Sequence, residues 1–175
     1  MAGKEYREIR PGKKTVKGLI VRVMLFFLGR GFQSLAARDP DIRKEIDGWS
    51  EGFTIMFNIM PFGPFWSIQK RGGKLRYLGM IKTGADLQVD FKNLETAFLV
   101  LTGQMGTPQG YAEHRVSVKG DLVLAMSMIR CLDIVQFYLF PAIIAKRVVK
   151  RLPRMTFGKF GRRVFVYLVG IPLGI

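Results

Sequence analysis

Residues 84–128, GADLQVDFKNLETAFLVLTGQMGTPQGYAEHRVSVKGDLVLAMSM, decide the fold. Polar and apolar residues alternate from 85 to 91, a period of two that predicts a strand with one solvated face. Asn93 is the N-cap of a helix predicted over 94–102, which Gly103 ends, and Pro108 opens a second short helix. A strand over 115–119 and a helix over 122–131 complete this unit.

Strand patterns also dominate the residues before this unit. Residues 53–60 alternate in the same way, and segments 65–70 and 75–80 flank Arg71-Gly-Gly-Lys74, a hairpin signal because glycine tolerates positive φ. Two helices are predicted before them: residues 16–37, weakened in the middle by Gly29 and Gly31, and a short helix from Asp39-Pro40 to about Gly48. Helices and strands are therefore segregated, which predicts an α+β fold with an antiparallel-dominated sheet covered on one face.

The chain divides into three parts in this interpretation. A basic arm covers residues 1–15, one domain covers 16–133, and a basic, apolar helical extension covers 134–175. From the end of the domain into the extension, residues 133–152 follow a helical pattern that Pro141 interrupts. No segment contains the roughly 18–20 consecutive apolar residues of a conventional transmembrane helix.

The charge of the chain is concentrated at its two ends. The net charge is +15, from 28 basic and 13 acidic residues. Residues 1–38 carry +7, residues 39–133 are neutral, and residues 134–175 carry +8 without a single acidic residue. Basic residues interleaved with Leu, Phe, Val and Ile favour an anionic membrane surface as partner. A nucleic-acid partner is the less favoured interpretation of the same charge.

One cysteine, Cys131, excludes an internal disulfide and is compatible with a reducing compartment. Arg22 divides the apolar stretch near the N-terminus, which argues against a signal peptide. We therefore expect a cytoplasmic protein that associates peripherally with membranes.

Residues 84–128 resemble the sterol carrier protein 2 domain family. The resemblance is carried by four pieces in order: Gly84–Phe91, Thr96–Met105, Val116–Asp121 and Leu124–Met126, with Tyr111 between the second and third. It extends more weakly over residues 16–133 and has no counterpart in the basic C-terminal extension.

The resemblance implies a five-stranded sheet packed against helices, with an apolar tunnel between them for a sterol, a fatty acyl chain or another lipid. It implies neither catalytic residues nor a cofactor. Some bacterial members, including accessory proteins of ubiquinone synthesis, also have extra helices after this domain. That similarity makes a polyprenyl or quinone precursor a candidate ligand.

An apolar cavity is also reasonable on physical grounds. Each buried methylene is worth about 0.8 kcal/mol, so a ~16-carbon chain gains on the order of 10 kcal/mol before ordering costs. Flexible Met side chains suit walls that repack around a ligand. The expected ligand-binding residues are Phe53, Ile55, Phe57, Leu87, Val89, Phe98, Leu101, Met105, Leu124, Met126 and Met128. For each of them, ordinary core packing is the competing interpretation.

A basic stripe in the extension is the expected membrane contact. Lys146, Arg147, Lys150 and Arg151 recur at i, i+1, i+4 and i+5, and Arg162 and Arg163 extend the positive charge. Each basic residue near an anionic surface adds about 1 kcal/mol to binding. A solvated basic face is the competing interpretation.

Enzyme chemistry has little support in the composition. The chain contains one histidine, His114, and one cysteine, which are too few for a His/Cys metal-ligand cluster and leave a single possible Cys-His pair. Asp86 and Asp90 share the polar side of one strand, where solvent exposure is the simplest explanation. We expect no catalytic residues, no metal and no cofactor.

Two functions from different classes remain. The first is a non-catalytic carrier that binds a lipid-like molecule and transfers or presents it at a membrane. The second is an accessory subunit of a membrane-associated complex, which uses the same fold and residues 134–175 for protein contacts.

Overall fold

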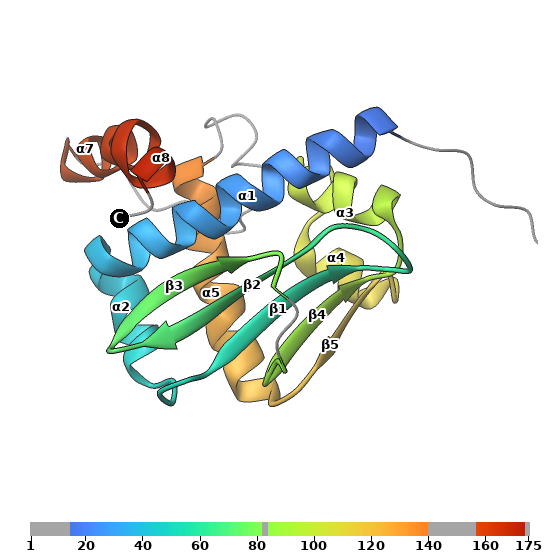
Figure 1. Ribbon diagram of the computed structural model, residues 1–175, viewed down its shortest axis with the longest axis horizontal. Helices are drawn as coiled ribbons and strands as arrows, with labels where there is room; N and C mark the ends of the chain where they lie inside the picture. Colours follow the sequence, from blue (N-terminus) through green and yellow to red (C-terminus); the bar gives the residue numbers. More distant parts are fainter. Residues whose placement is uncertain (1–14, 82–83, 140–156, 174–175) are drawn as a thin grey trace, which may run out of the picture.

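The computed structural model describes residues 15–81, 84–139 and 157–173. Its helices lie on one side of a five-stranded sheet (Figure 1). In chain order the elements are α1 (Thr15–Arg38), α2 (Pro40–Asp47), β1 (Thr54–Ile59), β2 (Phe65–Arg71), β3 (Lys74–Gly79), β4 (Leu87–Phe91), α3 (Leu94–Leu101), α4 (Thr107–Ala112), β5 (Val116–Lys119), α5 (Leu122–Leu139), α7 (Phe157–Phe165), a π-helical turn (Val166–Gly170) and α8 (Ile171–Leu173).

The sheet has the strand order β3-β2-β1-β4-β5. Three of its pairings are antiparallel, and β1 pairs with β4 in parallel, with Phe57 opposite Val89. The predicted α+β class and the mainly antiparallel five-stranded sheet are therefore confirmed. The hairpin between β2 and β3 turns at Gly72 and Gly73, which have φ values of 58° and 70°.

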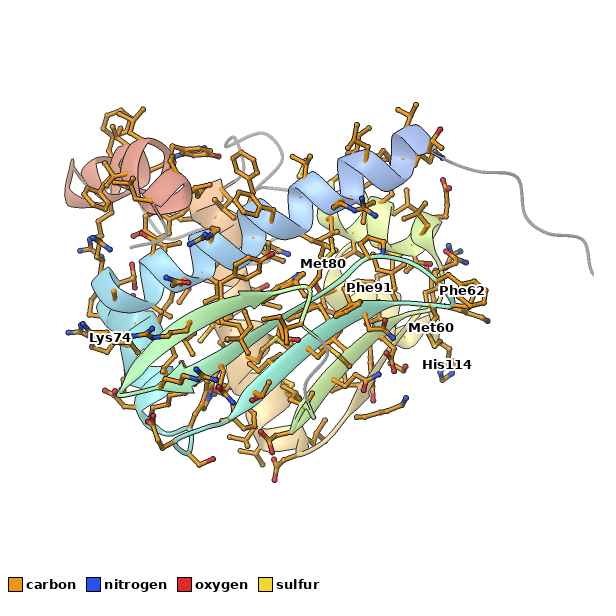
Figure 2. All side chains as sticks on the ribbon, in the orientation of Figure 1. Met60, Phe62, Lys74, Met80, Phe91 and His114 are labelled. Atoms are coloured by element: carbon orange, nitrogen blue, oxygen red, sulfur yellow. The ribbon has the colours of Figure 1, made fainter. Side chains whose placement is uncertain are left out.

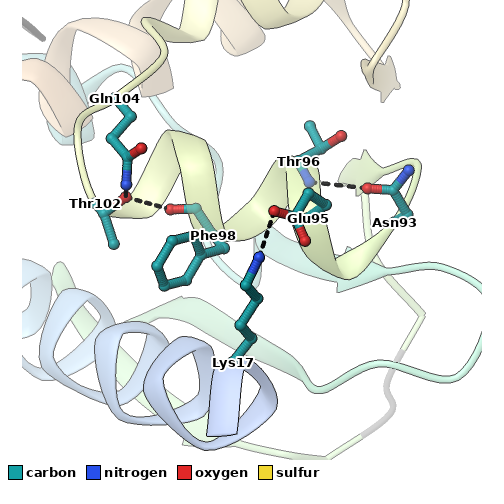
Figure 3. A network of polar contacts seen from close by, with 7 residues as sticks. All are labelled: Lys17, Asn93, Glu95, Thr96, Phe98, Thr102 and Gln104. Carbon is teal, nitrogen blue, oxygen red and sulfur yellow. Dashed lines mark hydrogen bonds and ion pairs between the residues drawn. The ribbon is translucent and has the colours of Figure 1, made fainter. Parts of the chain in front are cut away.

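The helices cover the sheet face on which Phe57, Trp66 and Tyr77 lie. Phe57 stacks on Trp66 with ring centroids 4.6 Å apart, and Trp66 lies 5.9 Å from Tyr77. Helix α1 crosses this face beside β3 and β2 and also packs on α3 and α5 (Figure 1). A Lys17–Glu95 ion pair of 2.6 Å joins the beginning of α1 to α3 (Figure 3).

The glycines in the middle of α1 let the helix approach its neighbours closely. A Cβ at Gly29 would overlap the ring of Tyr77 on β3. A Cβ at Gly31 would lie 3.0 Å from Leu139 Cδ1 on α5. The helix nevertheless runs without a break from Thr15 to Arg38, so the cost of these glycines in helix propensity is offset by packing.

Helices α1 and α5 are long and apolar enough, by mean hydropathy, to cross a membrane, although charged residues interrupt both. Half of each apolar segment is buried against the rest of the protein, and core helices of soluble proteins meet the same criteria of length and composition.

Helix α5 is longer than the sequence predicted. It continues to Leu139 instead of ending near residue 131, so the predicted boundary between residues 133 and 134 falls inside a helix. The reason is burial: Leu132, Val135, Phe137 and Tyr138 are all at most 5% exposed and continue the buried face of the helix.

The carboxylate of Asp90 is buried, contrary to the expectation of solvent exposure. Asp90 is 1% exposed. Its Oδ1 accepts hydrogen bonds from Asn58 (2.9 Å) and Gln88 (2.6 Å), and its Oδ2 pairs with Lys119 at 2.9 Å. Burial raises the pKa of Asp90, but the hydrogen bonds and Lys119 outweigh burial and hold that pKa below its ordinary value.

We predict that Asp90→Asn lowers the free energy of unfolding by about 1–3 kcal/mol at pH 7, because the amide loses the ion pair and one acceptor. A carboxylate whose folded pKa is lowered stabilises the folded state above its unfolded pKa, and this stabilisation is lost as the pH falls through the folded pKa. Urea unfolding at pH 7 and at about pH 3 should therefore show the difference from the wild type shrinking in acid. The exposed Asp47→Asn is the control, and equal losses at both pH values would contradict the prediction.

Candidate ligand cavity

A cavity of about 230 Å³ lies between α5 and the sheet. Strands β1, β4 and β5 form one side of it, α5 forms the other, and α3, α4 and one residue of α1 close it. Its lining residues are Leu28, Phe57, Val89, Phe91, Val100, Leu101, Thr107, Pro108, Tyr111, Val116, Val118, Leu122, Ala125, Met126, Met128, Ile129, Leu132 and Gln136.

The lining is apolar except at three positions. Thr107 and Tyr111 of α4 lie at one end, and Gln136 of α5 is the third polar residue. Among the residues that the structure describes, no acidic or basic side chain lines the cavity. An enclosed space of this kind fits an uncharged hydrocarbon, because a charged group would lose its hydration without finding a counter-charge.

One end of the cavity reaches the surface. Tyr111, Leu122 and Met126 line it and are 53%, 66% and 49% exposed. We call these three residues the mouth. At the other end, Leu28, Leu132 and Gln136 are each at most 5% exposed. The cavity therefore has an open end and a closed end.

Five of the eleven residues expected to bind a ligand line this cavity: Phe57, Val89, Leu101, Met126 and Met128. Four others are buried in the core without lining it, namely Phe53, Ile55, Leu87 and Met105. Ile55 and Leu87 share the face of Phe57 but lie at the other end of their strands. Phe53 packs on the ring of Trp49 instead, with centroids 5.4 Å apart.

Phe98 and Leu124 are the two remaining candidates, and neither lines the cavity. Both are half-buried and pack against the edge of the core. Phe98 lies beside the first turn of α1, with the ammonium of Lys17 5.4 Å from its ring centroid (Figure 3). The ring of Phe98, which was predicted to contact a ligand, therefore makes a cation–π contact with Lys17 instead.

Sequence reasoning missed most of the contribution of α5. Its lining residues are Leu122, Ala125, Met126, Met128, Ile129, Leu132 and Gln136, of which the sequence predicted only Met126 and Met128. Leu132 and Gln136 lie beyond residue 131, where the helix was expected to end. Leu122, Ala125 and Ile129 lie on the predicted helix but were not chosen as lining residues. Phe91, Val116 and Val118 were missed as well, although their strands had been recognised.

Of the residues expected to contact a membrane, Lys146, Arg147, Lys150 and Arg151 lie outside the described residues. Arg162 is one-third exposed, and its Nη1 donates to Oδ2 of the buried Asp39 at 3.0 Å. Arg163 is half-buried. Arg162 therefore has a structural partner, which leaves its membrane role without support.

Two other hollows are more open to solvent and have charged side chains in their lining. One, of about 660 Å³, lies between the beginning of α1, the 60–64 loop and α3, and Arg22 and Glu95 line it. Figure 2 shows Met60 and Phe62 at that end of the sheet, opposite Lys74. The second, of about 500 Å³, is a basic groove between α1 and β3, lined by Arg30, Arg38, Lys74 and Arg76 among others. Both are less enclosed than the α5 cavity.

Groups for catalysis are sparse in the described residues. They contain no cluster of three or more His, Cys, Asp or Glu side chains placed to hold a metal ion. His114 is exposed just after α4. Cys131 is 0% exposed, and burial raises the pKa of its thiol to about 12. Its sulfur is therefore a neutral thiol at pH 7 and a poor nucleophile.

Together, the fold and the cavity define a small α+β protein with an enclosed apolar binding space. The sequence matches no protein-family model and no curated protein.

Several solved structures with a similar fold carry the name of sterol carrier protein 2, the family that residues 84–128 resemble. A UbiJ-SCP2 ubiquinone synthesis protein shares 18% identity over 77% of this chain and 100% of its own, with a TM-score of 0.42. Sterol carrier protein 2 from Yarrowia lipolytica shares 15% identity over 64% and 89%, with a TM-score of 0.46. Sterol carrier protein domain 2 of Helicoverpa armigera shares 16% over 74% and 94%, with a TM-score of 0.45. At these values the similarity says nothing about the ligand of this chain.

We predict that Cys131 in the folded protein resists a thiol reagent such as dithionitrobenzoate at pH 8 and reacts fully in guanidinium chloride. The raised pKa and complete burial of the thiol both oppose reaction in the folded state. The rate should be at least about a hundredfold slower than that of an unfolded control. Rapid reaction in buffer would show that α5 separates readily from the sheet.

Proposed function

We propose that this protein is a non-catalytic carrier that binds a lipid-like molecule in the α5 cavity and transfers or presents it at a membrane surface. The observation that carries the proposal is an enclosed cavity of 230 Å³ with an apolar lining and one exposed apolar end. Burying part of a hydrocarbon chain there gains about 0.8 kcal/mol per methylene.

The mouth supports exchange with a membrane. Exposed Tyr111, Leu122 and Met126 provide an apolar surface beside the opening. A hydrocarbon chain that leaves the cavity between apolar side chains crosses less water on its way to a bilayer. Tyr111 also has the amphipathic ring that is favoured at membrane interfaces.

The charge distribution supports an anionic membrane as the partner. The net charge of +15 comes from the two ends of the chain, while residues 39–133 are neutral. The cytoplasmic leaflet carries a negative surface potential that attracts such segments. We therefore place the protein in the cytoplasm, bound peripherally to membranes through residues 134–175.

One observation is compatible with membrane docking by the carrier and also with the alternative of an accessory subunit. The outer side of α1 exposes six large apolar side chains: Val16, Leu19, Ile20, Val23, Phe26 and Phe27. A contiguous apolar strip on a helix is typical of a surface that another protein or a membrane covers. In this alternative α1 and the C-terminal extension pack into a complex, and the cavity binds nothing.

Native mass spectrometry of protein purified gently from its own host, with organic extraction of any bound species, tests the proposal. A stoichiometric lipid, sterol or polyprenyl species is the expected result. A mass of the chain alone, with no uptake of a fluorescent fatty acid, would reject the carrier function. Co-purification with a protein partner that resists salt and carries no lipid would favour the subunit.

We predict that Met126→Trp lowers the affinity for a fluorescent fatty acid at least about fivefold, because the indole fills the mouth of the cavity. Val123→Trp is the matched control. Val123 is 76% exposed one turn earlier on the same helix and does not line the cavity. Fluorescence titration of both variants should leave the control within about twofold of the wild type. Equal losses in both would show that the fatty acid binds elsewhere.

We also predict that Lys146→Gln/Lys150→Gln weakens binding to vesicles containing phosphatidylserine about tenfold or more. Each lysine near an anionic surface contributes about 1 kcal/mol. The control Lys44→Gln/Lys92→Gln removes two exposed lysines from the neutral part of the chain. Co-sedimentation at low and high salt measures both variants. Similar binding by the two variants would show that the overall charge, and not the extension, attracts the membrane.

A further inference from the structure

Gln136 is a buried polar residue that faces the apolar cavity. It is 3% exposed and lines the closed end together with Leu28 and Leu132. Among the described residues, its Oε1 is buried and has no hydrogen-bond donor. Arg30 Nε and Trp66 Nε1 are also buried, without a hydrogen-bond acceptor, but neither residue lines the cavity.

The other buried polar side chains of α5 have partners. Ser127 Oγ donates to Glu45 at 2.8 Å and accepts from Trp49 Nε1 at 2.9 Å. Tyr138 donates its hydroxyl to Asp39 Oδ2 at 2.8 Å. Buried polar atoms in folded proteins almost always have a hydrogen-bond partner, because an unpaired atom loses its hydration without compensation. Gln136 Oε1 therefore points to a donor supplied from outside the described residues.

Water is a poor candidate for this donor. A buried water needs two to four polar partners, and the residues beside Gln136 at the closed end are leucines. Esters, ethers and ionised carboxylates have no donor to offer. An ammonium group has donors, but its charge would be buried without a counter-ion. A neutral hydroxyl meets the requirement with a single O–H.

We propose that the ligand is a long-chain alcohol, whose hydroxyl lies at the closed end of the cavity and donates a hydrogen bond to Gln136 Oε1. This inference rests on the proposed carrier function and names its ligand class. It also fixes the orientation of the ligand: the polar group enters first, and the hydrocarbon chain extends toward the mouth.

The geometry of α5 supports this orientation. Its lining residues run from Leu122, 66% exposed, to Gln136, 3% exposed. Fourteen residues of helix separate them, about 21 Å at 1.5 Å per residue. A linear chain with its hydroxyl on Gln136 thus follows the apolar side chains of α5 and ends at Leu122 and Met126, where the surface is apolar.

The test compares tetradecanol with its methyl ether, which keeps the chain and the oxygen but has no donor. The affinity of each compound is measured by its displacement of a fluorescent fatty acid from three full-length proteins: the wild type, Gln136→Leu and Gln104→Leu. Gln104 is exposed and does not line the cavity, so Gln104→Leu is the control. The wild type and the control should prefer the alcohol about tenfold, and Gln136→Leu should show a ratio of about one with its affinity for the ether kept or improved.

The outcomes separate this inference from the proposed function. If neither the fluorescent acid nor the alcohol binds the wild type, the carrier function fails. If the probe binds but the wild type does not prefer the alcohol, or if the preference survives in Gln136→Leu, the alcohol assignment alone fails.

A second measurement uses the wild type only and holds even if Gln136→Leu does not fold. In protein labelled with carbon-13 and nitrogen-15, tetradecanol should shift the side-chain amide resonances of Gln136, and the methyl ether should leave them near their free positions. Equal shifts with both ligands, or shifts at other glutamines only, would overturn the assignment.

Discussion

The position of α5 is the constraint on which the cavity depends, and two carboxylates at the ends of α2 hold it. Asp39 accepts from Tyr138 of α5 and from Arg162 of α7, at 2.8 and 3.0 Å. Glu45 binds Arg130 at 2.6 and 2.7 Å and accepts from Ser127. These hydrogen bonds from Arg130 and Ser127 hold the pKa of Glu45 below its ordinary value despite burial, so the carboxylate is charged at neutral pH. A helix fixed in this way cannot move onto the sheet without breaking charged hydrogen bonds, which leaves the space beneath it open.

The length of α5 decides what that space contains. If the helix ended near residue 131, both Tyr138 and Gln136 would leave it. The protein would then lose the contact to Asp39 and the only polar side chain at the closed end among the described residues. Burial of Val135 and Tyr138 stabilises the last turns of α5, as far as Leu139, and Gly31 lets α1 pack against that last residue. The closed end is therefore a product of tertiary packing and not of local helix propensity.

Local signals in the sequence predicted most of the fold. Asn93 caps α3 through a 2.8 Å bond to the Thr96 amide, and Asp39 caps α2, as their side-chain chemistry requires. The parallel pairing of β1 with β4 depends on residues about 32 apart and left no local sign. The buried network of Asp90 and the contact of Lys17 with Phe98 are likewise side-chain arrangements between distant segments, which periodicity cannot distinguish from solvent or ligand contacts. Five cavity residues were found because strand and helix periods identify the inward face, although they do not show where that face is left unpacked.

An empty cavity and a buried amide oxygen without a donor are both costly in the unliganded protein. Lining atoms around an empty space lose dispersion contacts, and a buried acceptor without a donor loses its hydration. A single ligand with a hydrocarbon chain and one hydroxyl removes both costs, because each belongs to the same lining surface. Ligand binding then raises the free energy of unfolding by RT ln(1 + [L]/Kd). On this argument, the residues that would stabilise the empty protein most, a leucine at 136 and larger side chains along α5, are also the ones that would prevent it from holding a ligand.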